Sequence, residues 1–490
     1  MSLDAKHPLY TRHIADWAMG RDLYAGEGRI KERGQEYLPP TASMRLDGLE
    51  LGQPGTAAYE AYRLRAILPD YFKEAVESLV GIMHQKEPTF ELPKAMESLK
   101  SRATVKGEGL PALLRSINAE QLITGRIGLH LDLPNRPVSG PTLPYIATYT
   151  AENIINWDEG ATADNINSLN LVVLNESGKR RGPNGFDWED VTRYRVLMLG
   201  DLLANEPEGS AIYKSGLFEV FGKGGLEFTD SVMIEPKYQG RALGQIPFVF
   251  INSRDIVPEP DEPPLLGLAR LVLAIYRGEA DYRQSLHMQG QDTLVVTGRV
   301  QDGGEMPGQS ANPLRTGAGA LIETDPGGDA KYIGVSSAGL PEQREALHND
   351  RAEAEAKAGR LIAPTQSQQE SGTALKTRLT AQTASLNQIA LAGAAGLETL
   401  LKICAVWIGA NPDQVKVVPN LEFADFDYGG QELVQIMTAR GMGAPLSKRS
   451  IHRLMVDRGL TQMAYEDELD LVAEEDAGAG TPLDDYEDEA

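Results

Sequence analysis

The sequence predicts an α+β protein that is mainly α-helical. Two stretches with helical spacing of apolar residues flank a β-branched, glycine-rich insertion between residues 263 and 360. An unusually long apolar helical stripe follows from Ser371 to about residue 410. Alternating β-branched segments fill the region between Asn167 and Asn252. With 490 residues, the chain is long enough for about three domains and a large core.

The first predicted helix of the central region begins after Pro263 and Pro264, because proline is tolerated at or before a helix start. Its apolar face has three-, four- and sevenfold spacings at Leu268, Leu271, Ile275, Tyr282 and Leu286. The run TLVVTGRV then predicts a strand, and glycines and prolines interrupt the chain after it.

A second helix is predicted to start near Pro341, in LPEQREALHNDRAEAEAKAG. Charged residues crowd its surface: Glu342, Arg344, Glu345, Asp350, Arg351, Glu353, Glu355 and Lys357. Because an apolar stripe of its own cannot hold so polar a helix, we expect it to pack among neighbours of mixed charge or to rely on repeated i,i+4 pairs.

The third helix follows the polar segment APTQSQQ, and Ser371 is its candidate N-cap. Its stripe spans about ten turns, far more than an average helix. The stripe consists of Leu375, Leu379, Leu386, Ile389, Leu397, Leu400, Cys404 and Trp407. Gly393 and Gly396 lie in its middle, where we expect a kink.

The flanking regions have simpler patterns. A helical stretch from Tyr59 to Met83 is interrupted at Pro69, and residues 109–134 predict a helix followed by a strand. Four strands are predicted in LNLVVLNE, VTRYRVLML, GLFEVFG and QIPFVFIN. A short strand and three short helices follow the long helix, and Ser447 is the candidate cap of the second of these.

The only compact basic run is Lys179, Arg180 and Arg181. It is typical of a solvated hairpin tip, and an outward protein contact is the alternative.

The bulk composition excludes several classes of protein. The single cysteine, Cys404, rules out an intrachain disulfide framework or a CxxC metal site, which fits a reducing compartment. No apolar run was found that approaches the eighteen residues of a membrane span, and the N-terminus lacks a signal-peptide core. We therefore expect a soluble protein, cytoplasmic when made, that makes no membrane contact.

The net charge of −23 is concentrated at the C-terminus, where twelve acidic residues and no Lys or Arg follow from Glu466 onwards. The rest of the chain is still acidic. This balance argues against tight binding of nucleic acid through phosphate neutralisation, whereas a conduit for sliding DNA requires weak contact.

No motif for catalysis is evident in the sequence. There is no P-loop, HExxH, GxSxG or strand–GxGxxG–helix unit, so we expect no enzymatic activity and no cofactor or metal. His130 and Asp132 form an H-x-D pair on one predicted strand, which is compatible with two metal ligands or simply with the polar face of a half-buried strand.

In their order along the chain and in their amino-acid sequences, these segments resemble those of the portal proteins of tailed bacteriophages. Portal proteins are the head–tail connectors through which DNA enters and leaves the capsid. PPLLGLARLVLAIYRGEADYRQSLHMQGQDTLVVTG resembles the family's first stem helix running into the clip, and SGTALKTRLTAQTASLNQIALAG the start of its long wing helix. The helix with Tyr59, Tyr62, Arg63 and Arg65, followed by Gly81 and the exit at Lys86 and Pro88, and the segment PYIATYTAENIINWDEG, are also similar. The resemblance rests on the collinear order of these segments along the chain.

The resemblance implies a portal-type fold divided as follows: 1–262 wing, with helical and β-rich parts; 263–290 first stem helix; 291–337 small α/β clip; 338–360 second stem helix; 361–370 tunnel loop; 371–429 long kinked spine helix and a following strand; 430–476 helical crown; 477–490 acidic disordered tail. It also implies that the tunnel loop projects toward a DNA channel with its short or neutral residues Thr365, Gln366, Ser367, Gln368 and Gln369. An ordinary surface loop is the alternative.

The implied function is structural: a ring, by resemblance a dodecamer, at one capsid vertex of the virion, assembled in the host cytoplasm for genome packaging and ejection. Its implied partners are the terminase large subunit, adaptor or head-completion proteins, major capsid and scaffolding proteins, and double-stranded DNA bound without sequence specificity. Glu342, Arg344, Glu345, Asp350, Arg351 and Glu353 would then make contacts between subunits. The alternatives are a metal- or acid-dependent hydrolase using His130 and Asp132, and a non-viral oligomeric scaffold.

Overall fold

The computed structural model divides the chain into two units, residues 1–423 and 424–490. It describes residues 3–134, 143–162, 165–200, 212–221, 227–228, 233–289, 293–297, 327–333, 339–359, 372–421, 423, 430–445, 447–457, 461 and 463–478. Both α-helices and β-strands are well represented, in agreement with the predicted α+β class.

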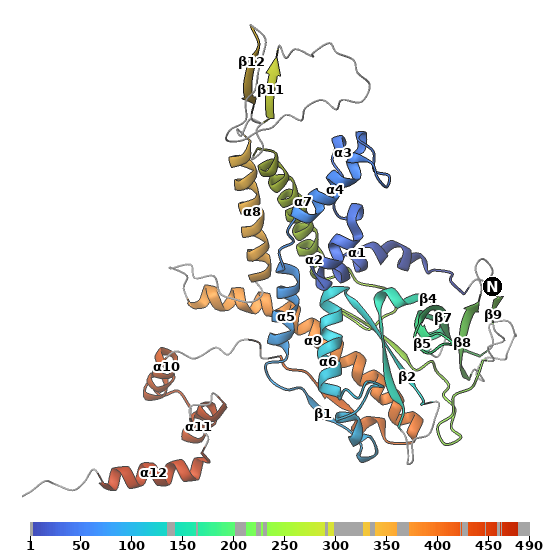
Figure 1. Ribbon diagram of the computed structural model, residues 1–490. Coiled ribbons are helices and arrows are strands. Elements are labelled where there is room, and N and C mark those ends of the chain that lie inside the picture. Colours follow the sequence, from blue (N-terminus) through green and yellow to red (C-terminus); the bar gives the residue numbers. More distant parts are fainter. Residues whose placement is uncertain are drawn as a thin grey trace, which may run out of the picture. The chain divides into compact units, whose positions relative to one another are not determined.

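A group of helices forms the N-terminal part of the first unit (Figure 1). It comprises α1 (Pro8–Ala25), α2 (Glu27–Arg33), α3 (Ala42–Leu46), α4 (Pro54–Arg65), α5 (Tyr71–Met83) and α6 (Leu110–Ile123), with short 3-10 turns at Gly34–Glu36 and Lys94–Lys100. The interruption expected at Pro69 is confirmed, because α4 ends before it and α5 begins after it. The helix and strand predicted in residues 109–134 are α6 and β2.

The first unit contains a three-stranded antiparallel sheet. Its order is β10 (Phe248–Asn252), β2 (Arg126–Asp132), β3 (Tyr145–Thr150). Ile251 pairs with Ile127, and Leu129 pairs with Thr148. Every residue of β10 is buried, so this strand lies inside the fold and not at a solvated edge.

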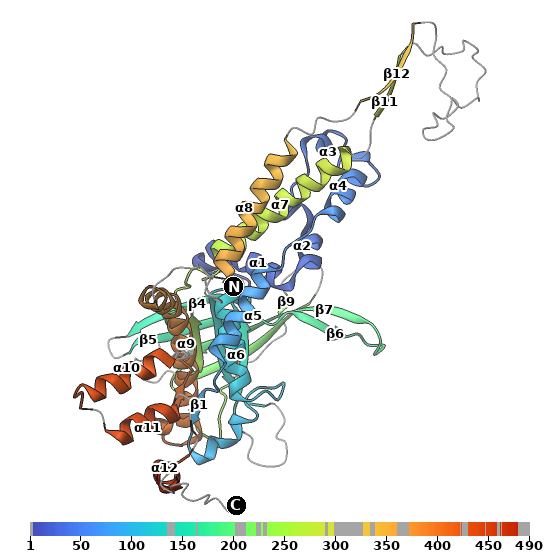
Figure 2. The ribbon, with the colours of Figure 1, turned by 90° about the vertical axis from the view of Figure 1, so that its left-hand side faces the viewer.

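A larger, six-stranded sheet contains most of the segments predicted as strands. Its elements are β4 (Ile154–Thr162), β5 (Asn165–Asn175), β6 (Gly178–Arg181), β7 (Trp188–Leu199), β8 (Tyr213–Phe221) and β9 (Glu227–Phe228). β6 pairs only with β7, and the two form an arm that extends from the sheet (Figure 2). The basic run lies on this arm: Arg180 pairs with Glu219 at 2.7 Å, and the Arg181 guanidinium lies over the Trp188 ring.

The long helix α9 (Gly372–Ile408) packs on both β10 and β2 and on α6. From Leu386 onwards its predicted stripe is buried, including Leu397, Cys404 and Trp407. The chain then forms a short 3-10 turn (Pro412–Gln414) and β13 (Lys416–Val418), which pairs with β1 (Thr89–Glu91).

The two central glycines of α9 occur where other elements approach the helix closely. A Cβ atom at Gly396 would lie 2.3 Å from Ile251 Cγ1, and one at Gly393 would lie 2.7 Å from Asn118 Nδ2. No side chain fits at either position without movement of its neighbours. The kink expected at these residues stays a prediction, but close packing is a sufficient reason for both glycines.

The expectation that no segment is apolar enough for a membrane span is wrong. Residues Ala384–Ile408 of α9 reach this length, with a mean hydropathy of 1.7. However, 67% of the apolar window is buried inside the protein. The core helix of a soluble protein meets the same criterion, so the segment is weak evidence for a membrane contact.

Two helices and a β-hairpin project from the rest of the first unit (Figures 1 and 2). They are α7 (Leu266–Gln289), β11 (Thr293–Thr297), β12 (Asp329–Ile333) and α8 (Leu340–Gly359). α7 and α8 pack side by side, and the antiparallel β11–β12 pair lies between them in the chain. Leu268 and Ile275 of the predicted apolar face are buried, whereas Leu286, near the hairpin end of α7, is 43% exposed.

The second unit contains α10 (Gly430–Gly441), α11 (Lys448–Asp457) and α12 (Tyr465–Gly478). The backbone N–H of Ser450 donates to Ser447 Oγ at 2.9 Å, which confirms the predicted cap. The side chains of His452 and Tyr465 pack edge to face between α11 and α12. Except for Ala477 and Gly478 at the end of α12, the predicted acidic tail lies outside the described residues.

Candidate functional site on the paired helices α7 and α8

The contact between α7 and α8 has a narrow apolar centre. Leu347, Ala354 and Ala358 of α8 are buried, and their spacing places them on one face of the helix. Opposite them, a Cβ atom at Gly278 of α7 would lie 3.0 Å from Leu347 Cδ2, so the helices approach closely at this glycine. Helix α5 also packs on α8, and α8 therefore has more apolar support within its own chain than its composition predicts.

A buried carboxylate joins the two helices. The side chain of Glu279 on α7 is only 4% exposed. Its Oε1 accepts a hydrogen bond of 2.5 Å from Arg283 Nε on the same helix, and its Oε2 accepts one of 2.5 Å from Arg351 Nη2 on α8. Both arginines are more than a third exposed, so the triad spans from the interior to the solvent. The bond from Arg351 is the one that crosses between the helices, and this charge-assisted bond holds them in one register.

A groove opens beside this triad. It encloses about 440 Å³ and is lined by Glu279, Tyr282, Arg283, Arg344, Leu347, His348, Arg351, Ala352 and Glu355. At its rim, Glu355 accepts a hydrogen bond of 2.9 Å from the Tyr71 hydroxyl of α5. Among the described lining residues there are three arginines and two carboxylates: Glu279, which Arg283 and Arg351 bind, and the exposed Glu355, which accepts one hydrogen bond from a neutral hydroxyl. The groove is therefore locally basic on a strongly acidic protein.

The six residues predicted to contact other subunits all lie on α8, but in different environments. Arg351 is bound to Glu279 of its own chain, and Glu353 pairs with Lys357 at 2.9 Å. Asp350 is half-buried. Glu342, Arg344 and Glu345 are exposed and make no ion pair with any described residue. Contact of these residues with another subunit stays a prediction.

The predicted tunnel loop, with Thr365, Gln366, Ser367, Gln368 and Gln369, lies outside the described residues. Its two flanking elements are described: α8 ends at Gly359, and α9 begins at Gly372.

The His130 and Asp132 pair of the hydrolase hypothesis belongs to a buried polar network between the two sheets. His130 Nε2 lies 2.9 Å from the Tyr213 hydroxyl, and Asp132 forms an ion pair of 3.2 Å with Arg195. The Tyr145 hydroxyl also donates to Asp132. Among the described residues, no group of three or more His, Cys, Asp or Glu side chains is placed to hold a metal.

Burial explains the protonation state of this histidine. The side chain of His130 is fully buried, and desolvation lowers its pKa to about 4 despite the opposing effect of Asp132. A neutral imidazole bonded to a tyrosine links the sheets. Among the described residues, no further His, Cys, Asp or Glu side chain completes a metal site with this pair.

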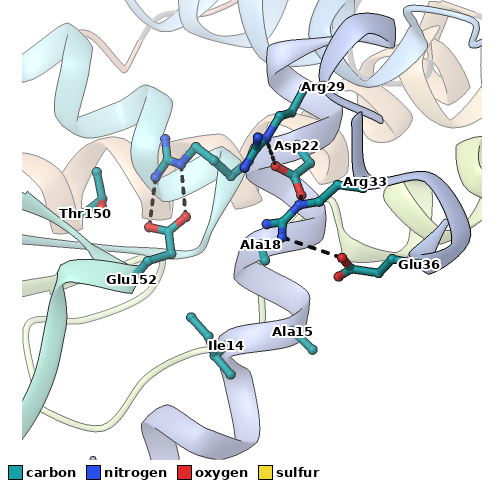
Figure 3. Close-up of a pocket in the computed structure, with 10 residues that line it drawn as sticks. Ile14, Ala15, Ala18, Asp22, Arg29, Arg33, Glu36, Thr150 and Glu152 are labelled. Carbon is teal, nitrogen blue, oxygen red and sulfur yellow. Dashed lines mark hydrogen bonds and ion pairs between the residues drawn. The ribbon is translucent and has the colours of Figure 1, made fainter. Parts of the chain in front are cut away.

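A second ionic network, which the sequence did not predict, surrounds a pocket of about 550 Å³ beside α1 (Figure 3). Asp22 is 2% exposed and accepts hydrogen bonds from Arg29, Arg33 and Tyr37. Burial and the bond to Asp22 raise the pKa of Tyr37. The network anchors α2 and the following turn to α1.

The neighbouring Arg21 joins α1 to α6 and to the turn before β4. It donates to both oxygens of Glu120, at 2.7 and 2.6 Å, and to Glu152 at 3.0 Å. Burial lowers the pKa of Arg21, but these hydrogen bonds outweigh that effect and hold it above its ordinary value. Every carboxylate described in the pocket has a cationic partner in the chain, so the network is already saturated without a ligand.

Comparison with known proteins gives one family match and several distant structural similarities. Residues 264–408, which run from the start of α7 to the end of α9, match a family described as a domain of unknown function, DUF4055. No curated protein matches the chain. A chain from the neck of a native GTA particle, computed with C12 symmetry, is 14% identical, with 79% of this chain and 89% of that chain covered and a TM-score of 0.38.

Two further solved structures show the same level of similarity. A chain from the neck of an empty GTA particle, computed with C6 symmetry, is 14% identical, with coverage of 80% and 90% and a TM-score of 0.38. A chain from the virion of a native gene transfer agent particle is 13% identical, with coverage of 85% and 99% and a TM-score of 0.39. All three chains come from the neck or the virion of gene transfer agent particles, and their sequence identity to this chain is low.

Proposed function

We propose that this protein is a portal subunit: a structural component that forms a ring at one vertex of a tailed-phage capsid and has no catalysis of its own. Copies of the chain would surround a channel for double-stranded DNA during packaging and ejection. The terminase large subunit would dock on the clip, and adaptor or head-completion proteins would replace it later. Major capsid and scaffolding proteins would surround the ring in the virion.

The observation that carries this proposal is the arrangement of residues 266–408. Two packed helices, α7 and α8, are joined through a β-hairpin and followed in the chain by a helix of 37 residues. This order agrees with the stem, clip and spine that the resemblance to portal proteins implies. A helical pair that projects from the fold and ends in a hairpin suits a scaffold better than an enclosed active site (Figure 2).

The net negative charge of the molecule favours weak binding of DNA, which suits a channel that DNA passes through. At a net charge of −23, the chain repels phosphate at long range. Weak contact without sequence specificity is what a sliding duplex requires, since each cation bound to phosphate adds salt-dependent affinity. The neutral residues of the predicted tunnel loop fit the same requirement.

Electron microscopy of the purified full chain tests the proposal directly. We expect ring-shaped particles with a central channel, and light scattering should give a mass that is a multiple of the 53.2 kDa subunit. A chain that stays monomeric at micromolar concentration and low salt would contradict the proposal.

A second experiment addresses the predicted tunnel loop. Changing Gln366, Gln368 and Gln369 to Lys should leave the ring intact but slow DNA translocation or release, because a ring of ammonium groups holds phosphates. Normal rates of packaging and ejection in this triple variant would show that the loop does not face DNA.

A further inference from the structure

Helix α8 has two exposed flanks of opposite charge. With 3.6 residues per turn, Glu342, Glu345 and Glu353 project on the side opposite the buried Leu347 and Ala354. All three glutamates are exposed, and the Lys357 bound to Glu353 offsets only one of them. We refer to Glu342, Glu345 and Glu353 as the acidic face.

The basic groove between α7 and α8 lies on a different flank of the same helix. Arg344, His348 and Arg351 recur at helical spacings of four and three, and the groove of about 440 Å³ opens above them. Arg351 is bound to Glu279, but Arg344 has no ion-pair partner among the described residues. The groove therefore presents a guanidinium group, that of Arg344, that forms no ion pair with the described part of the chain.

We propose that the basic groove of one copy receives the acidic face of α8 from a second copy. This inference rests on the proposed function and identifies the surface through which the ring would close. The groove and the acidic face are different surfaces of one chain, so their contact is heterologous, and each copy uses both surfaces at once. Such a contact closes into a ring when the rotation per subunit divides a full turn, as a portal requires.

Charge complementarity favours the acidic face of a second copy as the occupant of the basic groove. The acidic face supplies two carboxylates, Glu342 and Glu345, that have no ion-pair partner among the described residues, and the groove supplies Arg344. Glu342 and Glu345 are three residues apart and Arg344 and His348 are four apart on the same helix, so each pair spans about one helical turn. Individual exposed pairs contribute little, but a ring repeats each pair once per subunit.

Charge reversal with mixing tests the proposal. The groove variant Arg344→Glu with His348→Glu has two acidic surfaces, and the face variant Glu342→Arg with Glu345→Arg has two basic surfaces. We expect each variant alone to lose ring formation in electron microscopy and light scattering at low salt. An equimolar mixture should regain rings, because an acidic groove then meets a basic face and a basic groove meets an acidic face in alternation.

The controls separate folding, assembly in general and this contact. Far-ultraviolet circular dichroism verifies that each variant is folded before mixing. Arg102→Glu with Lys106→Glu reverses two exposed charges away from α8 and should leave rings unchanged. Monomeric wild-type protein would overturn the proposed function together with this contact.

If the wild-type protein forms rings, the variants distinguish the portal function from the contact between the basic groove and the acidic face. If either variant alone then also assembles, the contact is wrong while the portal function stands. The contact is equally wrong if the folded mixture fails to recover rings. If the groove variant forms rings that package less DNA, the groove binds phosphate and not a second copy, which also overturns the inference.

Discussion

Replacing Gly396 with alanine separates two opposing effects on the stability of α9. Alanine is favoured over glycine in a helix interior by about 1 kcal/mol. The added methyl group, however, would lie 2.3 Å from Cγ1 and 2.5 Å from Cδ1 of Ile251, a fully buried residue of β10. Overpacking of this kind typically costs about 1–3 kcal/mol. We therefore expect Gly396→Ala to lower the free energy of unfolding by up to about 2 kcal/mol.

Gly81 of α5 is the matched control. It is exposed in a helix, and a Cβ atom there would meet nothing within 4 Å. Gly81→Ala should therefore stabilise the protein by up to about 1 kcal/mol in urea unfolding under the same conditions. The difference between the two variants isolates the overpacking cost. Equal stabilisation by both substitutions would refute the close approach of α9 and β10.

A double-mutant cycle with Ile251→Ala tests the identity of the contact. Alone, Ile251→Ala should cost about 2–5 kcal/mol, because it leaves a cavity in a buried strand. In that background the methyl group of Gly396→Ala enters free space, so its cost should disappear. A coupling energy near zero between the two positions would assign the strain to another neighbour.

Three further predictions concern the buried ionisable groups and α8. Replacing both Arg283 and Arg351 with Met should lower the free energy of unfolding in urea by about 3–5 kcal/mol, because Glu279 is left as an unpaired buried charge. Adding Glu279→Met should restore most of the lost stability, because it removes that charge. Because the folded pKa of His130 is about 4, its unfolded form takes up a proton first as the pH falls below about 6.5. The stability of the wild type should therefore drop more steeply than that of His130→Gln between pH 6.5 and 4, by about 3 kcal/mol in total, and parallel pH profiles would contradict this. The backbone amides of α8 should exchange hydrogen more slowly in assembled rings than in dissociated subunits. The amides of α9 from Leu397 onwards should exchange at the same rate in both samples.

Local patterns were sufficient to predict the main helices. Proline and the apolar spacing placed the start of α7 and the break before α5, because both features act within one turn of the chain. Ser447 was found in the same way, since a cap depends on a donor three residues away. For α9 the burial of Leu397, Cys404 and Trp407 follows directly from their periodicity.

The pairing of strands and of buried charges was not predictable. β10 has the same β-branched composition as the strands before it, yet it joins β2 from a region more than a hundred residues earlier. Its choice of partner depends on contacts that no local pattern encodes. Glu279 and Asp22 are likewise ordinary acidic residues in helical stretches, and only the assembled fold shows that arginines from other turns and elements surround them.

Several charged residues of α8 take no part in the packing of this helix against the described part of its own chain. Within its chain the helix buries one leucine and two alanines as its apolar contact, and apolar burial stabilises in proportion to area. Alanine contributes little area, so the Glu279 triad supplies much of the specificity of its packing on α7. Arg344, Glu342 and Glu345 take no part in either contact among the described residues. Because these charges form no ion pair that packs α8 among the described residues, we propose that they contact another molecule, as the charge-reversal experiment tests.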